Sequence, residues 1–400
     1  MNRLLILWLL MLALSQSCTS FGQELTLHDV LTITRQVNPK LQSLDHLVKA
    51  RQGAMQQADV ALNPRIGLNA GNRVQVLKIG QELEYSGKRA ARTQVALAEV
   101  EVAKSELDLV VLELQQEVTK LFYDLLWAQK NVELLQNNLQ ITEKFLEAAT
   151  YKFNQGFGNK LDVVKGQVEV ARAKRLLKST EQTLVVGQNR MKILLKMPSN
   201  NALLLKGDLF QTVFHFAKNL DSLLLVAAQH HPALLAEKHR LKAAEYQVVV
   251  AQLSSKPNFD FELAGGVDQK EPTAELSINV PLALWDTKKG AKAEAQFQQK
   301  SQEYSVEEAR NNITQQVMAA YFDYQTATAS ARLFEETLLR EAKEAAANAQ
   351  TAFETGGFRF LDLIDAQRTY LEAGLEYYES LRALRQAEID LQAAVGISTF

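Results

Sequence analysis

The chain has 400 residues, of which 47% are hydrophobic and 22% are charged, and its formal net charge is −2. This balance of charge argues against a nucleic-acid-binding protein and against a polyanionic substrate. Cys18 is the only cysteine, so no disulfide can form within the chain.

Residues 1–22 have the pattern of a signal peptide. Arg3 supplies the positive charge, an apolar run over 4–14 is too short to span a bilayer, and small residues follow it. A cut after Gly22 suits an ordinary signal peptidase, and the alternative is that Cys18 becomes a lipid-bearing N-terminus. Both possibilities export the mature protein. Because no later segment has the length and apolar character of a membrane helix, any membrane contact has to be made by β-strands.

The mature sequence is internally duplicated. We expect a first repeat at 23–200, a linker at 201–219 and a second repeat at 220–400. The motifs recur at separations of 193 and then 200 residues, with the seven extra residues between the second proline and the lysine pair. The matching motifs are Asn38-Pro39 with His231-Pro232, Asn63-Pro64 with Lys256-Pro257, Ser86-Gly87-Lys88-Arg89 with Asp286-Thr287-Lys288-Lys289, and Phe153-Asn154-Gln155-Gly156 with Phe353-Glu354-Thr355-Gly356.

The first repeat is predicted to hold three helices, a β-hairpin and a glycine turn. Thr26 and Asp29 have the spacing of a capping box at the start of the first helix. In chain order the elements are a helix over 27–62, a β-hairpin over 65–86, a long helix over 88–152, a tip turn over 155–160 and a helix over 161–195.

The long helix is marked by apolar residues that step by four and three from Leu107 to Leu139, which is a coiled-coil seam. Its 65 residues correspond to about 97 Å of helix at 1.5 Å per residue. The two shorter helices of the repeat have a similar summed length, so we expect them to lie end to end beside it.

The second repeat shows the same order of elements. A similar seam runs from Ile313 to Leu338. The predicted elements are a helix over 222–253, a β-hairpin over 258–285, a long helix over 288–353, a tip turn over 355–360 and a helix over 361–394.

The two hairpins alternate apolar and polar residues, most clearly at Phe259, Phe261 and Leu263. Their strands suit a tilted membrane β-strand. Four strands cannot close a membrane barrel, and an open sheet edge is not tolerated in lipid. The chain is therefore expected to oligomerise, and three copies related by cyclic symmetry would supply twelve strands.

The order of these motifs resembles the TolC family of outer-membrane efflux proteins over nearly the whole mature chain. The residues that carry the resemblance are Leu25-Thr26-Leu27, Asn38-Pro39-Lys40-Leu41, Phe122-Tyr123-Asp124-Leu125, Tyr151-Lys152-Phe153-Asn154-Gln155-Gly156 and Leu161-Asp162-Val163, with the second-repeat motifs at Phe353 and Leu361. The resemblance implies a homotrimer with a 12-stranded barrel in the outer membrane of a Gram-negative bacterium, and a long periplasmic α-barrel built from the duplicated coiled-coil helices.

The resemblance also assigns roles to the tip. The two turns would contact a periplasmic adaptor protein, which is joined to an inner-membrane pump, expected to be of the RND type. Asp362 and Asp365 would face the pore near its closed end as two rings of three carboxylates, with Asp162 as the related acid of the first repeat. The alternative is that these aspartates are solvated charges favoured by the helix dipole. The residues expected at the turns are Gly156, Phe157, Gly356, Gly357 and Phe358.

The stretch from Gln81 to Arg89, with Arg92 after it, is similar to the heavy-metal branch of the family, the CzcC-like proteins, although a basic cluster beside a barrel strand is also typical of a membrane-interface anchor. The sequence shows no catalytic, cofactor or metal-site motif, so it predicts a passive duct rather than an enzyme. The alternatives are a periplasmic coiled-coil adaptor or scaffold, and a type I protein-secretion duct.

Overall fold

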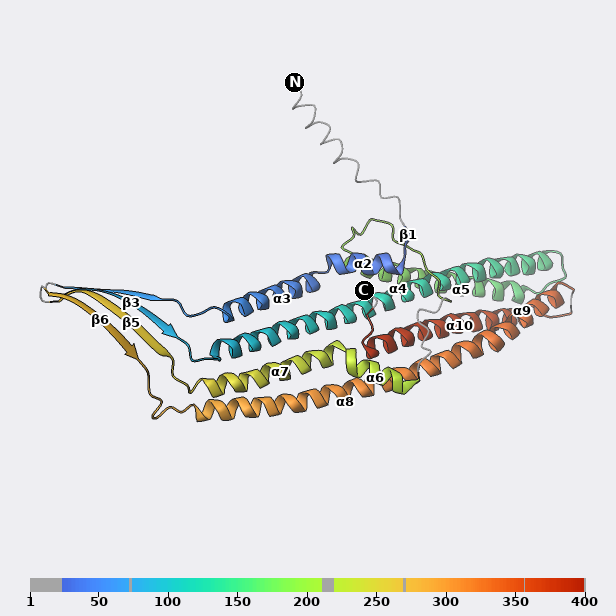
Figure 1. The fold of residues 1–400 in the computed structure, drawn as a ribbon. Helices are drawn as coiled ribbons and strands as arrows, with labels where there is room; N and C mark the ends of the chain where they lie inside the picture. Colours follow the sequence, from blue (N-terminus) through green and yellow to red (C-terminus); the bar gives the residue numbers. More distant parts are fainter. Residues whose placement is uncertain (1–23, 72–73, 211–218, 269–270, 356, 399–400) are drawn as a thin grey trace, which may run out of the picture.

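The computed structural model describes residues 24–71, 74–210, 219–268, 271–355 and 357–398. The expected signal peptide with Cys18, Gly356 of the second tip turn and residues 211–218 of the linker lie outside these ranges. The described chain is a long rod with a small β-sheet at one end and two helical hairpins at the other (Figure 1).

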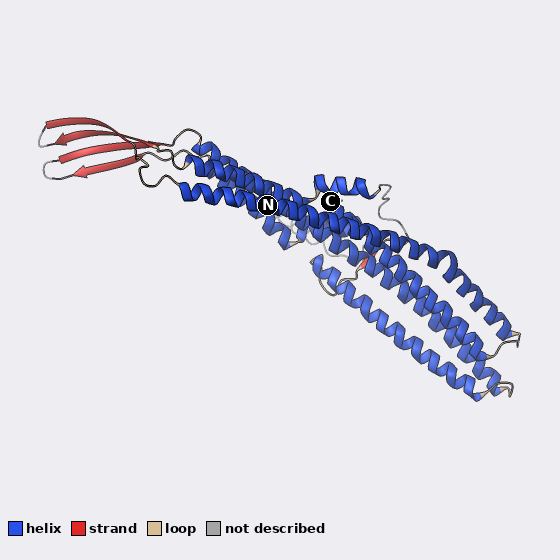
Figure 2. Cartoon of the chain, turned by 90° about the horizontal axis from the view of Figure 1, so that it is seen from below, coloured by secondary structure: helices blue, strands red, loops and turns tan. Residues whose placement is uncertain are grey.

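Four antiparallel strands form the sheet, and the two hairpins lie side by side in it (Figure 2). The outer strands each keep one edge without a strand partner among the described residues. The order is β2 (Arg65–Ala70), β3 (Val74–Leu83), β5 (Phe259–Asp268) and β6 (Glu271–Asn279).

The two faces of the sheet differ in polarity, as the alternation of side chains along a strand requires. On one face Lys78 Nζ donates to Glu262 at 2.8 Å. The other face is apolar across all four strands. One row of residues that pair across the strands is made of Ile66, Ile79, Leu263 and Leu276. Their side chains are 48–76% exposed.

Toward both ends of the rod, the helices form a single layer. Next to the sheet, the neighbours in order are α3 (Pro39–Ala58), α4 (Lys88–Asn154), α7 (Pro232–Leu253) and α8 (Lys289–Leu333). Toward the other end they are α5 (Lys160–Leu194), α4, α10 (Phe360–Val395) and α9 (Leu339–Glu354). The shorter helices thus follow one another alongside the long rods (Figure 1).

Each repeat begins with two helices where the sequence predicted one. The expected helix over 27–62 is divided into α2 (Leu27–Val37) and α3, which already ends at Ala58. The helix expected over 222–253 is divided into α6 (Leu220–His230) and α7. Asn38 and His231 have extended backbones, with ψ of 120° and 122°, because a following proline disfavours the helical conformation. Both side chains then cap the helix that starts at the proline.

The second long helix also departs from the prediction of one helix over 288–353. A π-helical segment, η1 (Phe334–Leu338), separates α8 from α9, whereas α4 runs without interruption. The segment contains neither glycine nor proline, so no helix breaker marks it in the sequence. The spacing of apolar residues by four and three continues along the sequence through Ala331, Phe334 and Leu338, so the sequence pattern gave no sign of the change.

A second layer covers the middle of the rod. β1 (Glu24–Leu25) pairs in parallel with β4 (Leu204–Leu205), which belongs to the linker. The largest core cluster includes Val30 of α2, Phe122 of α4 and Leu209 of the linker, each at most 1% exposed. The described part of the linker therefore packs into the core. None of the described helices has both the length and the apolar character needed to cross a membrane.

Candidate functional site

The first predicted tip turn joins α4 to α5. Phe157 N–H donates to Lys152 O and Gly156 N–H to Phe153 O, both at 3.0 Å, which satisfies carbonyls at the end of α4. Gly156 has φ 80°, a left-handed conformation that glycine adopts without steric cost. The side chain of Phe157 is 88% exposed, so the turn presents a large apolar ring to its surroundings.

The second tip turn joins α9 to α10 at the same end of the rod (Figure 1). Gly357 N–H and Phe358 N–H both donate to Ala352 O, at 2.7 and 3.1 Å. Phe358 is 49% exposed, so this turn too presents an aromatic ring. Gly356, expected to match Gly156, lies outside the described residues.

The two helical hairpins contact each other close to these turns. Lys152 Nζ of the first hairpin lies 3.9 Å from the centre of the Phe353 ring of the second, and within the second hairpin the Phe353 and Phe360 ring centres are 5.9 Å apart. Further from the turns, Arg368 of α10 donates to Glu169 of α5 at 2.9 Å. A cation over an aromatic ring and an ion pair between helices therefore hold the tip of one chain together.

Two of the predicted tip acids, Asp162 and Asp362, lie in the first turns of α5 and α10, and Asp365 lies in the next turn of α10. The Asp362 carboxylate accepts hydrogen bonds from the Arg359 side chain and backbone at 3.1–3.2 Å, and these bonds hold the pKa of Asp362 below its usual value. Asp365 lies 3.8 Å from Arg368. Asp162 is half-buried in the first turn of α5. The structure thus gives both second-repeat aspartates an arginine neighbour, which the sequence analysis did not foresee.

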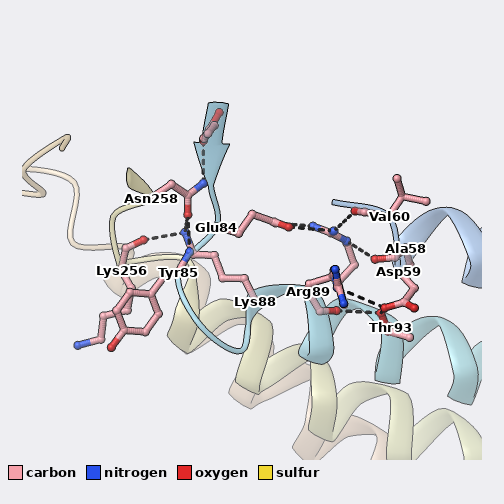
Figure 3. A network of polar contacts seen from close by, with 12 residues as sticks. Ala58, Asp59, Val60, Glu84, Tyr85, Lys88, Arg89, Thr93, Lys256 and Asn258 are labelled. Carbon is pink, nitrogen blue, oxygen red and sulfur yellow. Dashed lines mark hydrogen bonds and ion pairs between the residues drawn. The ribbon is translucent and has the colours of Figure 1, made fainter. Parts of the chain in front are cut away.

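The basic stretch after β3 builds a polar network where the sheet meets the helices (Figure 3). Arg92 donates to the two carboxylate oxygens of Glu84 at 2.7 and 3.2 Å. It also donates to the carbonyl of Ala58, the last residue of α3, at 2.8 Å and to that of Val60, two residues further on, at 3.2 Å. One guanidinium therefore satisfies a carboxylate and the free carbonyls at a helix end.

Lys88 ties this joint to the second repeat. Its Nζ donates to Lys256 O and to Asn258 Oδ1, both at 2.7 Å, and Tyr85 N–H donates to the same Asn258 oxygen at 3.1 Å (Figure 3). The basic residues that suggested a membrane anchor in the sequence are therefore used within the chain, at least at Lys88 and Arg92.

Halfway along the rod, a hollow of about 880 Å³ opens between α4, α7, α8 and α10. His231, at its edge, is 6% exposed, and its Nδ1 accepts a hydrogen bond from Ala233 N–H at 3.2 Å. Burial lowers the pKa of His231, which favours the neutral ring that this acceptor role requires. In the described part of the chain, no three or more His, Cys, Asp or Glu side chains are grouped so that they could hold a metal ion.

Several glycines have a steric role that the sequence analysis missed, among them one in the first tip turn and one at the end of α10. A Cβ on Gly158 would lie 2.6 Å from Phe153 N, and one on Gly396 would lie 2.8 Å from His231 Cα. Gly396 lies at the end of α10 and has φ 81°. The matching position 200 residues earlier is Lys196, which follows α5 and has φ 50°. The repeat offset was the signal that could have identified this position.

The model of a family described as outer membrane efflux protein matches residues 30–194 and 223–397. The cobalt-zinc-cadmium resistance protein CzcC of Cupriavidus metallidurans is 25% identical over 381 residues, which cover 93% of this chain and 90% of that protein. Among solved structures, CusC matches with a TM-score of 0.78 at 14% identity, and the match covers 94% of this chain and 93% of the CusC chain. The MtrE outer membrane channel of Neisseria gonorrhoeae has a TM-score of 0.76 at 19% identity, covering 92% and 88%.

The two matched segments fall one on each repeat and together take in most of the chain. They confirm the resemblance to the TolC family that the motifs indicated, and the relatives are efflux proteins rather than enzymes. This chain belongs to the outer membrane efflux protein family, whose channels lie in the Gram-negative outer membrane and extend into the periplasm.

Proposed function

We propose that three copies of this chain form a passive duct that carries heavy-metal cations out of the cell as part of a tripartite efflux system. The observation that carries the trimer is the pair of unpaired sheet edges, on β2 and β6. Backbone groups at such edges cannot remain unpaired in lipid. If β6 of one copy pairs with β2 of the next, three chains close a barrel of twelve strands, and four strands alone cannot.

The flanks of the helical layer support the same assembly. One stripe on α8 has the spacing of a coiled-coil seam, with 40–73% exposure at Phe297, Tyr304, Met318, Phe322 and Leu333. A second stripe runs along α5 on the opposite flank, with 44–77% exposure at Leu161, Val164, Val168, Val186 and Ile193. Neighbouring copies would bury these stripes and extend the layer into a closed α-barrel.

The tip is the surface that we assign to the periplasmic adaptor, and through it to an inner-membrane pump of the RND type. The exposed rings of Phe157 and Phe358 are apolar contacts at the end of the rod, on turns closed by backbone hydrogen bonds of Gly156 and Gly357. These turns are rigidly placed because the two hairpins are joined through Lys152 and Phe353.

The cargo is proposed from the relative CzcC, whose name states cobalt, zinc and cadmium resistance and whose alignment covers 93% of this chain. The metal ions are cargo in this proposal, so the chain needs no resident metal site. The test compares the growth of a host in which the gene is deleted with that of the same host complemented with it, at increasing concentrations of Co²⁺, Zn²⁺ and Cd²⁺. Tolerance that does not change with the chain present would remove metals as cargo and turn attention to polypeptide secretion.

The trimer is tested by the mass of the protein in mild detergent, from light scattering, together with circular dichroism. Phe322→Glu places a charge in the exposed stripe of α8 and is expected to lower the mass to that of a single chain. Arg310→Glu introduces the same side chain on another exposed face of α8 and should leave the trimer mass unchanged. A wild-type protein that is a single chain in detergent would contradict the proposal.

A further inference from the structure

Residues 280–288 connect β6 to α8 without regular secondary structure. Leu282 and Leu284 add apolar side chains beyond the end of β6, where the chain turns and Leu284 N–H donates to Leu282 O at 3.0 Å. Leu282 is 73% exposed, Leu284 68% and Trp285 91%. This connection is therefore an exposed apolar segment at the joint between the sheet and the helices.

The matching segment of the first repeat has a different use. In the first repeat, Glu84 binds Arg92. The matching positions 200 residues later are Leu284 and Lys292, and Lys292 donates to Ser255 at 3.0 Å instead. The second repeat has therefore replaced the carboxylate of the internal clamp by an apolar side chain.

A second basic position of this joint, Arg89 in the first repeat, also has a different environment in the second repeat. Arg89 lies 3.4 Å from Asp59, but the residue that matches Asp59 by the 193-residue offset is Gln252. Lys289, which matches Arg89, is exposed and has no ion-pair partner among the described residues. An exposed tryptophan followed four residues later by an unpaired lysine is a pattern suited to a membrane surface, where an indole and a cation both meet headgroups.

We propose that the connection 280–289 binds the anionic phospholipid headgroups of the leaflet that faces the periplasm, with Trp285 in the headgroup layer and Lys289 at a lipid phosphate. The inference rests on the proposed placement of the sheet in the membrane. Leu282 and Leu284 lie on the side of Trp285 nearer the strand and enter the acyl region. A neighbouring copy of the chain is the competing occupant of this surface.

Tryptophan fluorescence tests the depth of the connection. The chain has Trp8 in the expected signal peptide, Trp127 and Trp285, so Trp127→Phe leaves one emitting tryptophan in the mature protein. This change is mild, because Trp127 Nε1 is buried without a hydrogen-bond partner and phenylalanine keeps an aromatic ring beside Arg382. The variant is placed in vesicles of phosphatidylcholine with bromine atoms at different depths of the acyl chain.

We expect lipids brominated near the headgroup to quench Trp285 more strongly than lipids brominated near the chain end. Quenching by aqueous acrylamide alone would overturn the proposal, and so would resistance to both quenchers, which would place a second copy over the segment. A control with Ile278→Trp, Trp285→Phe and Trp127→Phe reports on the sheet itself. If lipids brominated deep in the acyl chain quench the fluorescence of the Ile278→Trp variant but no brominated lipid quenches Trp285, the sheet lies in the membrane and this inference fails. If neither tryptophan is quenched, the proposed placement of the sheet in the membrane fails.

The charge preference is tested with brominated phosphatidylglycerol in a phosphatidylcholine background. Lys289→Gln should reduce the preference for the anionic lipid around Trp285 about fivefold, which is the factor for one cation near an anionic surface. Arg89→Gln, at the matching position of the first repeat, should leave this preference unchanged. Equal effects of both variants, or no effect of Lys289→Gln, would contradict the assignment of Lys289 to lipid phosphate.

Discussion

At the scale of single residues, Lys196 and Gly396 show how duplicated positions acquire different constraints. Both have positive φ and follow the last helix of their repeat. A side chain at this φ is strained, and at Gly396 it would also collide with His231. No comparable neighbour prevents a lysine at 196, so the first repeat tolerates a side chain that the second cannot hold.

Lys196→Gly is therefore expected to stabilise the protein, by up to about 1 kcal/mol, because relief of left-handed strain is partly offset by the greater freedom of glycine in the unfolded chain. Gly396→Ala should destabilise it by more than that amount. Thermal unfolding in mild detergent compares the two variants with the wild type. Equal destabilisation at both positions would contradict the role given to His231.

Arg92 provides a second prediction at this scale. Arg92→Ala leaves Glu84 and the carbonyls of Ala58 and Val60 without their shared donor, and we expect a loss of about 1–3 kcal/mol. Arg92→Lys should recover only part of it, since an ammonium cannot reproduce the guanidinium fork. The control is Arg89→Ala, which removes an exposed pair worth about 0.2–1 kcal/mol. Midpoints of chemical unfolding decide between these values, and full recovery by lysine would rule out the fork geometry.

At the scale of elements, the long helix α4, the hairpins and the glycine turn at Gly156 could be predicted because each depends on local periodicity or on one backbone angle. The breaks at Asn38 and His231 were missed because helical periodicity passes through them, and only the effect of proline on the preceding residue divides the helix. The use of Arg92 could not be predicted, because its partners lie on two separate segments, 58–60 and the one that contains Glu84, that only the fold brings beside it.

The cap at the start of α7 should make stability depend on pH. Burial lowers the pKa of folded His231 below its unfolded value of about 6.5, so the unfolded chain binds the proton more readily. The stabilisation is fully present above about pH 6.5 and is lost as the pH falls from there toward the folded pKa. His231→Asn, which copies the Asn38 cap of the first repeat, should therefore lose less stability between pH 7 and pH 5 than the wild type, as measured by thermal unfolding. The same loss in both proteins would contradict the role of the neutral imidazole.

At the scale of the whole molecule, the two repeats share a plan but differ where function is proposed. The first repeat binds its basic residues internally at the joint with the sheet, and the second leaves Trp285 and Lys289 exposed there. At the tip, the second repeat carries Asp362 and Asp365, whereas the first has Asp162 followed by Lys165. Trimer closure is proposed from the two outer edges of the four-stranded sheet, because only another copy of the chain can fill them.

The tip acids make the last prediction. In a trimer, Asp362 and Asp365 would form two rings of three carboxylates, since residues three apart share a helix face. Asp362→Ala combined with Asp365→Ala should raise ion conductance through planar bilayers or weaken the block by multivalent cations. Arg359→Gln should strengthen that block, because Arg359 neutralises Asp362 in the single chain.

The pH dependence and a control complete this test. The hydrogen bonds from Arg359 keep the pKa of Asp362 low, so the block should persist as the pH falls to the usual carboxylate range and weaken only below it, and Arg359→Gln should move this loss to higher pH. Asp162→Ala is the matched control from the first repeat and should change conductance less, because Lys165 leaves that repeat without a second acid. If the double variant leaves both conductance and block unchanged, the aspartates are solvated charges at a helix start, and the constriction of the duct has to be sought among other residues.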